Sequence, residues 1–311
     1  MSIQQELALF EEQVEREHAI NRRIEVAKMR KQGKRLGVTV TTKEQEEARQ
    51  KGLERKRAIE KQQAEDIDLR HYSVQMNQAH KNMDIDPVAR GIAVALSVHM
   101  HTKTESYIVD GNRNRMNTAQ VSKAIGKSKP VTVKALQIAV TEGIVIEHTK
   151  GNGHDKFYSL NPTYYSIGSL GRVTESFTKV IHTSIRNVLK KLSLEEMGHL
   201  SILVNYMHPE THVLFMNPDE QDERFLRILQ PKDIAEILDI KPAKARKLIN
   251  KLITIQVLFE LRVGTEKSIA TVIGVDPEFF TKSKFKIDFD KIKRAVSQTT
   301  LNSKNYNKNF K

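Results

Sequence analysis

The feature that most constrains how this chain folds is an internal repeat. Residues 117–146 align with residues 230–259 without a gap, at an offset of 113 residues. Apolar positions coincide in the two copies, as Val121 and Ile234 do, or Leu136 and Ile249. Self-similarity at a fixed offset is the signature of a duplicated folding unit, so we expect two copies of one structure in tandem.

Flanking segments extend the match. The helical pattern before each copy has a start signal: Asp86-Pro87 in the first, and Ser193 with Glu196 three residues later in the second. These flanking similarities indicate that the duplicated unit is longer than the ungapped alignment. The matching segments are GIAVALSVHMH (91–101) with GHLSILVNYMH (198–208), and NPTYY (161–165) with DPEFF (276–280).

Each copy predicts the same order of elements. A first helix is followed by a short β-rich piece, at 106–109 and 212–216, and then by two helices separated by a short turn. A hairpin follows, with glycines in its turn, over 144–160 and 257–274. This is the order of a winged helix-turn-helix. The expected fold class is therefore α+β, mainly helical, with two tandem winged helix-turn-helix domains and an N-terminal charged helical arm.

The expected domain organisation follows from changes of pattern along the chain. In the arm, apolar residues recur at helical spacing and Thr42 opens a second helix as a capping box with Gln45, but neither helix has enough apolar face to be stable alone. The arm is either a mobile charged segment or a partner-binding, dimerising helix. A helix over 175–192 is expected to pack the two domains together or to form a dimer seam. The expected parts are 1–69, charged helical arm; 70–168, winged-helix domain 1; 169–281, winged-helix domain 2; 282–311, a disordered basic tail.

The amino-acid composition indicates which chemical class of partner the chain binds. The formal net charge is +13, and a basic balance of this size favours a polyanion, most commonly nucleic acid. Cysteine is absent, which excludes disulfides, thiolate metal sites and cysteine nucleophiles. The sequence has no run of about 18 apolar residues and no signal-peptide pattern at its N-terminus, so we expect a cytoplasmic protein with no membrane partner.

The second helix of the second copy, within DIKPAKARKLINKL (239–252), is the expected DNA-reading helix. No acidic residue occurs from 242 to 254, whereas solvated helix faces usually mix charges. With Ile249 taken as the core direction, a helical projection places three lysines on the opposite side. Arg246 and Asn250 suit base edges, and the lysines suit phosphates. The expected contacts are Lys241, Lys244, Arg246, Lys247, Asn250 and Lys251.

The first copy carries aliphatic residues at two of these positions. Val131 and Ile138 correspond to Lys244 and Lys251. Exposed aliphatic residues suit a protein interface, so we expect the first copy to make protein contacts, as in a homodimer, with secondary phosphate contacts from its lysines. Two alternatives stay open: the aliphatic residues pack against the charged arm, or both copies read DNA equally. The secondary contacts expected are Lys127, Lys129 and Lys134.

The hairpins are candidate phosphate or minor-groove contacts. Lys150 and Lys156 lie on the first hairpin, and Arg262 and Lys267 on the second. The alternative is that these side chains are simply solvated hairpin tips.

Several segments, taken together, resemble the plasmid replication initiators of Gram-positive bacteria. The resemblance rests on FYSLNPTYY (157–165), on FTKVIHTSIRNVLKKLS (177–193) leading into LSILVNYM (200–207), and on the tandem arrangement, and it covers about 85–280. It implies that the first winged-helix domain serves dimerisation and the second binds DNA. Winged helices also occur in transcription repressors and phage regulators, so the fold alone does not decide the function.

No catalytic or cofactor site is expected. His99-Met100-His101 and Tyr164-Tyr165 resemble the metal-binding and nucleophilic residues of rolling-circle nickases, but the triplet ends a helical pattern, where residues i and i+2 diverge. Tyr164-Tyr165 match Phe279-Phe280, so ring packing suffices to explain them. His208 and His212 flank a proline turn, and there is no GxxxxGK[ST] phosphate loop. We therefore expect no enzyme, no metal and no cofactor.

The predicted function is sequence-specific binding of double-stranded DNA by a plasmid or phage replication initiator, with the arm contacting replication or transcription proteins. A transcription regulator of a mobile element is the alternative in the same class. A protein-interaction scaffold with incidental DNA binding is the alternative in another class, and the charged arm supports it.

Overall fold

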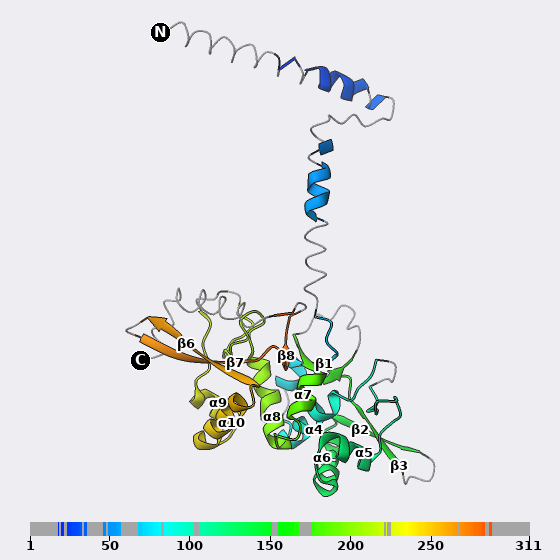
Figure 1. Cartoon of the computed structure of the whole chain (residues 1–311), viewed down its shortest axis with the longest axis vertical. Coiled ribbons are helices and arrows are strands. Elements are labelled where there is room, and N and C mark those ends of the chain that lie inside the picture. Colours follow the sequence, from blue (N-terminus) through cyan, green and yellow to red (C-terminus); the bar gives the residue numbers. More distant parts are fainter. Residues whose placement is uncertain are drawn as a thin grey trace. The chain divides into compact units, whose positions relative to one another are not determined.

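The computed structural model divides into two compact units, residues 1–67 and 68–311 (Figure 1). The structure describes residues 68–81, 84–102, 106–150, 155–167, 176–220, 222, 225–265, 268–283 and 286–287, and in the first unit 18, 20–21, 24–32, 34–35, 46–47 and 49–56.

The described residues of the first unit are helical and mostly exposed. Among them Ile20, Ile24 and Met29 are about half exposed, at 55%, 48% and 56%. The helical start predicted at Thr42 and Gln45 lies outside the described residues, as does the apolar spacing of the first 14 residues. The same holds for nearly all of the expected basic tail.

A four-stranded antiparallel sheet is the centre of the second unit. Its order is β4-β1-β5-β8, so strands from both copies of the repeat share one sheet. The two middle strands, β1 and β5, pair with each other. On the outer side of β1, Gln75 pairs with Tyr165 of β4, and on the outer side of β5, Val180 pairs with Phe280 of β8. The two halves of the sheet therefore repeat each other about its centre. The strands are β1 (Tyr72–Met76), β4 (Tyr165–Ser166), β5 (Phe177–Ile181) and β8 (Phe280–Thr281).

The helix expected over 175–192 is wrong in its first part. Strand β5 occupies Phe177–Ile181, and the helix α7 is His182–Val188. Thr178, Val180 and Ile181 are β-branched and nearly fully buried, and such residues favour strands when a partner strand is present. That partner is β1, which ends at Met76, far earlier in the chain.

The fold is a mixed α+β fold, and the helices and hairpins follow the expected order in both copies. The β-rich pieces expected at 106–109 and 212–216 form isolated β-bridges there and not strands. Each copy has a first helix, two helices joined by a short turn, and a two-stranded hairpin. In the first copy these are α4 (Pro87–Ser97), α5 (Thr118–Ile125), α6 (Lys129–Thr141), β2 (Val145–Lys150) and β3 (Asp155–Leu160), after a short α3 (Asn77–Lys81). In the second copy they are α8 (Leu194–Leu203) with η1 (Val204–Tyr206), α9 (Pro231–Ile237), α10 (Pro242–Thr254), β6 (Leu258–Thr265) and β7 (Ser268–Val275).

The predicted helix starts are confirmed. The Asp86 side chain accepts from the backbone N–H of Val88 at 2.6 Å. Ser193 and Glu196 form a reciprocal capping box, with distances of 2.7 and 3.1 Å. Each cap satisfies backbone donors that a helix leaves unpaired in its first turn.

Two glycines set the contact between the copies. A Cβ added at Gly91 of α4 would lie 1.7 Å from the backbone oxygen of Leu194, and a Cβ added at Gly198 of α8 would lie 1.7 Å from that of Pro87. The two helices therefore cross at a distance that only glycine allows, and the contact is reciprocal. One core cluster contains residues of both copies, so residues 70–168 and 169–281 share a hydrophobic core.

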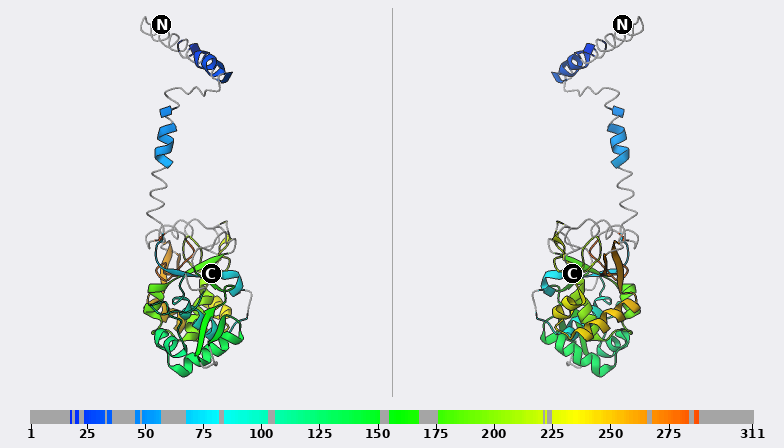
Figure 2. Two further views of the ribbon diagram at one scale, coloured as in Figure 1. Left: turned by 90° about the vertical axis from the view of Figure 1, so that its right-hand side faces the viewer. Right: turned by 90° about the vertical axis from the view of Figure 1, so that its left-hand side faces the viewer.

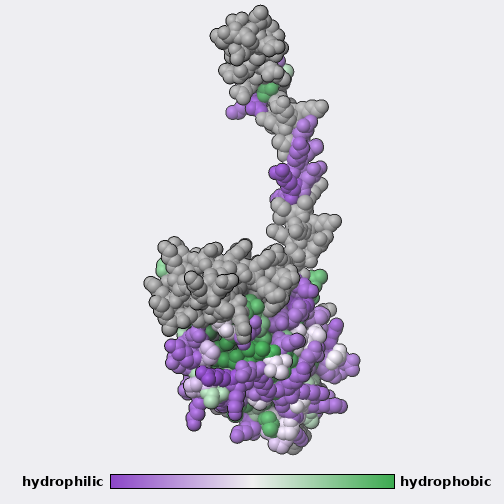
Figure 3. All heavy atoms as spheres, turned by 60° about the vertical axis from the view of Figure 1, so that its left-hand side comes forward, coloured by the Kyte–Doolittle hydropathy of each residue, from purple (hydrophilic) through white to green (hydrophobic). Residues whose placement is uncertain are grey.

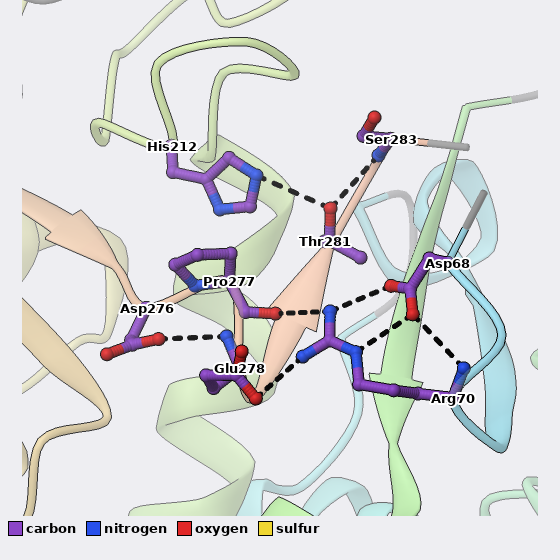
Figure 4. Close-up of polar contacts among 8 residues, drawn as sticks. All are labelled: Asp68, Arg70, His212, Asp276, Pro277, Glu278, Thr281 and Ser283. Carbon is purple, nitrogen blue, oxygen red and sulfur yellow. Dashed lines mark hydrogen bonds and ion pairs between the residues drawn. The ribbon is translucent and has the colours of Figure 1, made fainter. Parts of the chain in front are cut away.

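A polar cluster joins the start of the second unit to its last strand (Figure 4). The Arg70 guanidinium donates to both carboxylate oxygens of Asp68, at 2.9 and 2.7 Å, and to the carbonyl oxygen of Pro277 at 3.0 Å. It also forms an ion pair with Glu278 at 2.9 Å. These contacts connect residues 68–70 to the turn before β8.

None of the helices within the described ranges is both long and apolar enough to cross a membrane.

Candidate nucleic-acid interface

Helix α10 is amphipathic. Proline stands at its first position, where a missing N–H costs nothing, and Ala245, Leu248, Ile249 and Leu252 are buried at three- and four-residue spacing. The opposite side of the helix is left at the surface. Figure 3, which brings the α10 side of Figure 1 forward, shows mostly hydrophilic side chains on the lower part of this face.

The exposed face of α10 carries cations of two kinds, with and without an acidic partner among the described residues. Its exposed residues include Arg246, Lys247 and Asn250, with Lys241 at the N-cap. Among the described residues, none forms an ion pair with Lys241, Arg246 or Lys247 within 4.0 Å. Within the described part of the chain, no acidic side chain therefore pairs with these cations in competition with a ligand.

Lys244 and Lys251 differ from Lys247 in their partners, although the three lysines lie within about 60° of one another around the helix. Lys244 forms an ion pair with Glu195 at 2.6 Å, and Lys251 forms one with Glu196 at 2.6 Å. Both acids lie in the first turn of α8. Burial raises the pKa of Glu196, but hydrogen bonds from Lys251 and Ser193 outweigh it and hold that pKa below its ordinary value. The charges of these two lysines are thus balanced within the protein.

The aliphatic pair of the first copy has a packing explanation. Val131 is 50% exposed, whereas Ile138 is partly buried and packs against the main core cluster, so the expected exposure of Ile138 is wrong. The sequence match of α4 with α8 puts Val88 and Ala89 where Glu195 and Glu196 lie. Without those acids a lysine at either position of α6 would lack its partner.

Helix α6 has an exposed polar face of its own. Lys129, Lys134 and Gln137 are exposed, and the last two correspond to Lys247 and Asn250. Glutamine, like asparagine, can pair with adenine through two hydrogen bonds. Sequence reasoning missed Gln137, although its position opposite Asn250 in the ungapped alignment was the available signal.

Lys127 has a structural role in the turn between α5 and α6. Its ammonium group donates to the carbonyl oxygens of Leu189 and Leu192 at 2.8 and 2.6 Å, beyond the end of α7. Burial lowers the pKa of this lysine. A cation that satisfies the free carbonyls after a helix is engaged internally, so Lys127 is a poor phosphate ligand.

Of the phosphate contacts expected on the two hairpins, the structure describes the side chain of one, Lys156. Lys156 of β3 forms an ion pair with Glu147 of β2 at 2.9 Å, so its charge is partly balanced across the hairpin. The side chains of Lys150 and Arg262 lie outside the described residues, as does Lys267 altogether.

The histidine triplet and the tyrosine pair are not arranged as a metal site and a nucleophile. Helix α4 ends at Ser97, and Met100 forms a β-bridge with Ile108, so the histidine triplet follows the helix rather than ending it. Tyr165 is fully buried and donates to Gln75 at 3.2 Å, and burial raises its pKa. Within the described ranges, no three His, Cys, Asp or Glu residues are grouped as a metal site would require.

Hence the cationic and amide groups on α10 and α6 are the arrangement best suited to a polyanion. In comparisons with known proteins, no family model and no curated protein matches the chain.

Proposed function

We propose that residues 70–281 form two tandem winged helix-turn-helix domains and that the chain binds double-stranded DNA, with α10 in the major groove. The observation that carries this proposal is the exposed face of α10, where Arg246 and Lys247 have no ion-pair partner among the described residues and the amide of Asn250 is exposed. Arginine and asparagine supply the paired donors and acceptors that read guanine and adenine, and lysine neutralises phosphate.

Helix α6 is proposed as a second contact. It carries Lys134 and Gln137 at the positions of Lys247 and Asn250, but Val133 where α10 has Arg246. Arginine to guanine is the commonest specific base contact, so α10 supplies more sequence reading than α6. Of the two residues expected to form a protein interface on the first copy, only Val131 is exposed and remains a candidate.

The biological role we propose is initiation of plasmid or phage replication. It is supported by the resemblance of residues 85–280 to plasmid initiators and by the basic balance of the chain, with net charge +13. A plasmid that carries the DNA surrounding the gene and lacks another initiator should be maintained when this chain is supplied. Loss of maintenance with an Arg246→Ala/Lys247→Ala variant is expected, whereas repression of a nearby promoter without maintenance would instead identify a transcription regulator.

The DNA contact is tested by comparing two double variants that each remove two cations from α10. Arg246→Ala/Lys247→Ala removes exposed charges, and Lys244→Ala/Lys251→Ala removes charges held by Glu195 and Glu196. Affinity for duplex DNA is measured by fluorescence anisotropy at several salt concentrations. The first variant should bind about tenfold or more weakly, with a salt slope smaller by about one for each phosphate that is no longer neutralised.

The second variant is the matched control. It changes the net charge equally, so it should keep most of the wild-type salt slope. If the two variants weaken binding alike, attraction by overall charge explains the affinity and the proposed face is wrong. Wild-type binding by Arg246→Ala/Lys247→Ala would exclude α10 as the DNA-binding helix.

A further inference from the structure

A second cationic site lies away from α6 and α10. A cavity of about 660 Å³ is lined by residues from β1, from the segment after α4, from the turn at Arg113 and from α7. This volume is in the range of small-molecule sites. The described lining residues are Arg70, His71, Tyr72, Met100, His101, Thr102, Arg113, Ile167, His182, Thr183 and Arg186.

The charge of this lining is one-sided. Three arginines and three histidines contribute to it, and no described lining residue is acidic. Asp68 and Glu278 balance the charge of Arg70 (Figure 4). Neither Arg113 nor Arg186 has an ion-pair partner within 4.0 Å among the described residues. Two uncompensated guanidinium groups therefore border one cavity.

One residue that lines the cavity is a buried histidine. His182 is 5% exposed, and its Nε2 atom is buried without a hydrogen-bond partner in the described part of the chain. Such an atom normally has a partner, because an unpaired buried polar group costs free energy. His182 and Arg186 are four residues apart on α7, so both side chains lie on one side of that helix.

The electrostatics of these groups favour binding of an anion. Burial, together with the nearby Arg186, His71 and His99, lowers the pKa of His182 to about 3. Burial also lowers the pKa of Arg186, with no acidic group acting against it. A bound anion would reverse both effects, since an opposite charge favours the protonated form.

We propose that this cavity binds a small phosphate-bearing molecule, held by Arg113 and Arg186. Arginine matches phosphate oxygens with paired donors. A small molecule fits better than duplex DNA because both arginines line a cavity of small-molecule size, whereas a rigid duplex contacts protruding side chains. This site is independent of the DNA contact proposed for α10.

The test is isothermal titration of the full chain with pyrophosphate and with ATP at low salt. Arg113→Asn is the main variant: Arg113 has a φ of 66°, which asparagine tolerates, so the charge is removed with the backbone retained. Arg113→Asn and Arg186→Gln should each weaken binding about tenfold, the loss of one charge-assisted hydrogen bond. Arg227→Gln, an exposed arginine that does not line the cavity, should bind within about twofold of wild type.

Arg186 also donates to the Val98 carbonyl oxygen, so Arg186→Gln is used only if circular dichroism shows a wild-type fold. The imidazole signals give a second measurement, because ligand binding should raise the pKa of His182. Absence of binding at millimolar pyrophosphate and ATP would overturn the proposal, as would equal weakening by all three arginine variants. So would weaker duplex binding by Arg113→Asn with no small-molecule binding, which would make the cavity a DNA contact. The Arg246→Ala/Lys247→Ala variant should keep ligand affinity, which separates this site from the α10 proposal.

Discussion

At the scale of single residues, the chain buries several histidines in the neutral form. His80, His182 and His212 are at most 5% exposed. Burial is the first cause that lowers the pKa of each, to about 3, 3 and 4 from the ordinary 6.5. Arg90 adds to this effect at His80, and the hydrogen bond of His212 to the Val275 carbonyl oxygen opposes it only in part. Their burial therefore ties the stability of the fold to pH.

We predict that the contribution of these histidines to the free energy of unfolding is constant above about pH 7 and falls as the pH drops below 6.5. In that range the unfolded chain binds protons at these histidines and the folded chain does not, so protons favour unfolding until about pH 3 to 4. The expected loss at pH 5.5 is roughly 1 kcal/mol for each histidine. Urea unfolding at pH 7.5 and 5.5 measures it.

His212→Asn is the control for this pH dependence. Asparagine tolerates the φ of 57° at this position and does not titrate, so the difference between the two pH values should shrink by about 1 kcal/mol. An unchanged difference would show that His212 takes up its proton in the folded chain as readily as in the unfolded one.

At the scale of elements, the duplicated turns show the same backbone geometry with different residues. Gly126 and Asp239 end the first helix of each pair with φ of 68° and 48°. Gly143 and Gln256 follow α6 and α10 with φ of 71° and 62°. Positive φ favours glycine, so the second copy keeps the shape of both turns with less suitable residues.

A reciprocal exchange at the turn after the second helix tests this difference. Gln256→Gly should raise the free energy of unfolding by about 0.5 to 1 kcal/mol, and Gly143→Gln should lower it by about 1 kcal/mol. Gln256 is exposed and a Cβ at Gly143 meets no atom within 4 Å, so contacts contribute little to either change. Thermal or urea unfolding measures both, and changes of the same sign would show that φ does not decide them.

At the scale of the whole second unit, the two copies behave as one body because they share a sheet, a core and a close helix crossing. The strand order β4-β1-β5-β8 places the two copies edge to edge, and α4 meets α8 at Gly91 and Gly198. Figure 2 shows the same packed unit from two further sides. The repeat therefore builds one cooperative unit from two similar halves.

Gly198→Ala should destabilise this unit by about 3 kcal/mol, because its Cβ would lie 1.7 Å from a backbone oxygen that cannot move without separating the helices. Gly111→Ala is the control, since a Cβ there meets no atom within 4 Å, and a change within about 0.5 kcal/mol is expected. Urea unfolding followed by circular dichroism measures both. A small effect of Gly198→Ala would show that α4 and α8 separate freely.

The amino-acid sequence was enough to predict the duplication, the α+β class, the helix starts at Asp86 and Ser193, and both hairpins. Caps, helical periodicity and glycine turns depend on residues close together in the chain, so they can be recognised from the sequence alone. Strand β5 was missed because its partner β1 lies far along the sequence.

Which cations of α10 remain unpaired depends on the tertiary structure. Lys244 and Lys251 contact Glu195 and Glu196, which are 49 and 55 residues away, so Arg246 and Lys247 are left without an ion pair among the described residues. The packed fold also brings Arg113 and Arg186 to one cavity. A helical projection gives the spacing of side chains around a helix, but the direction of each face depends on the helices packed against it.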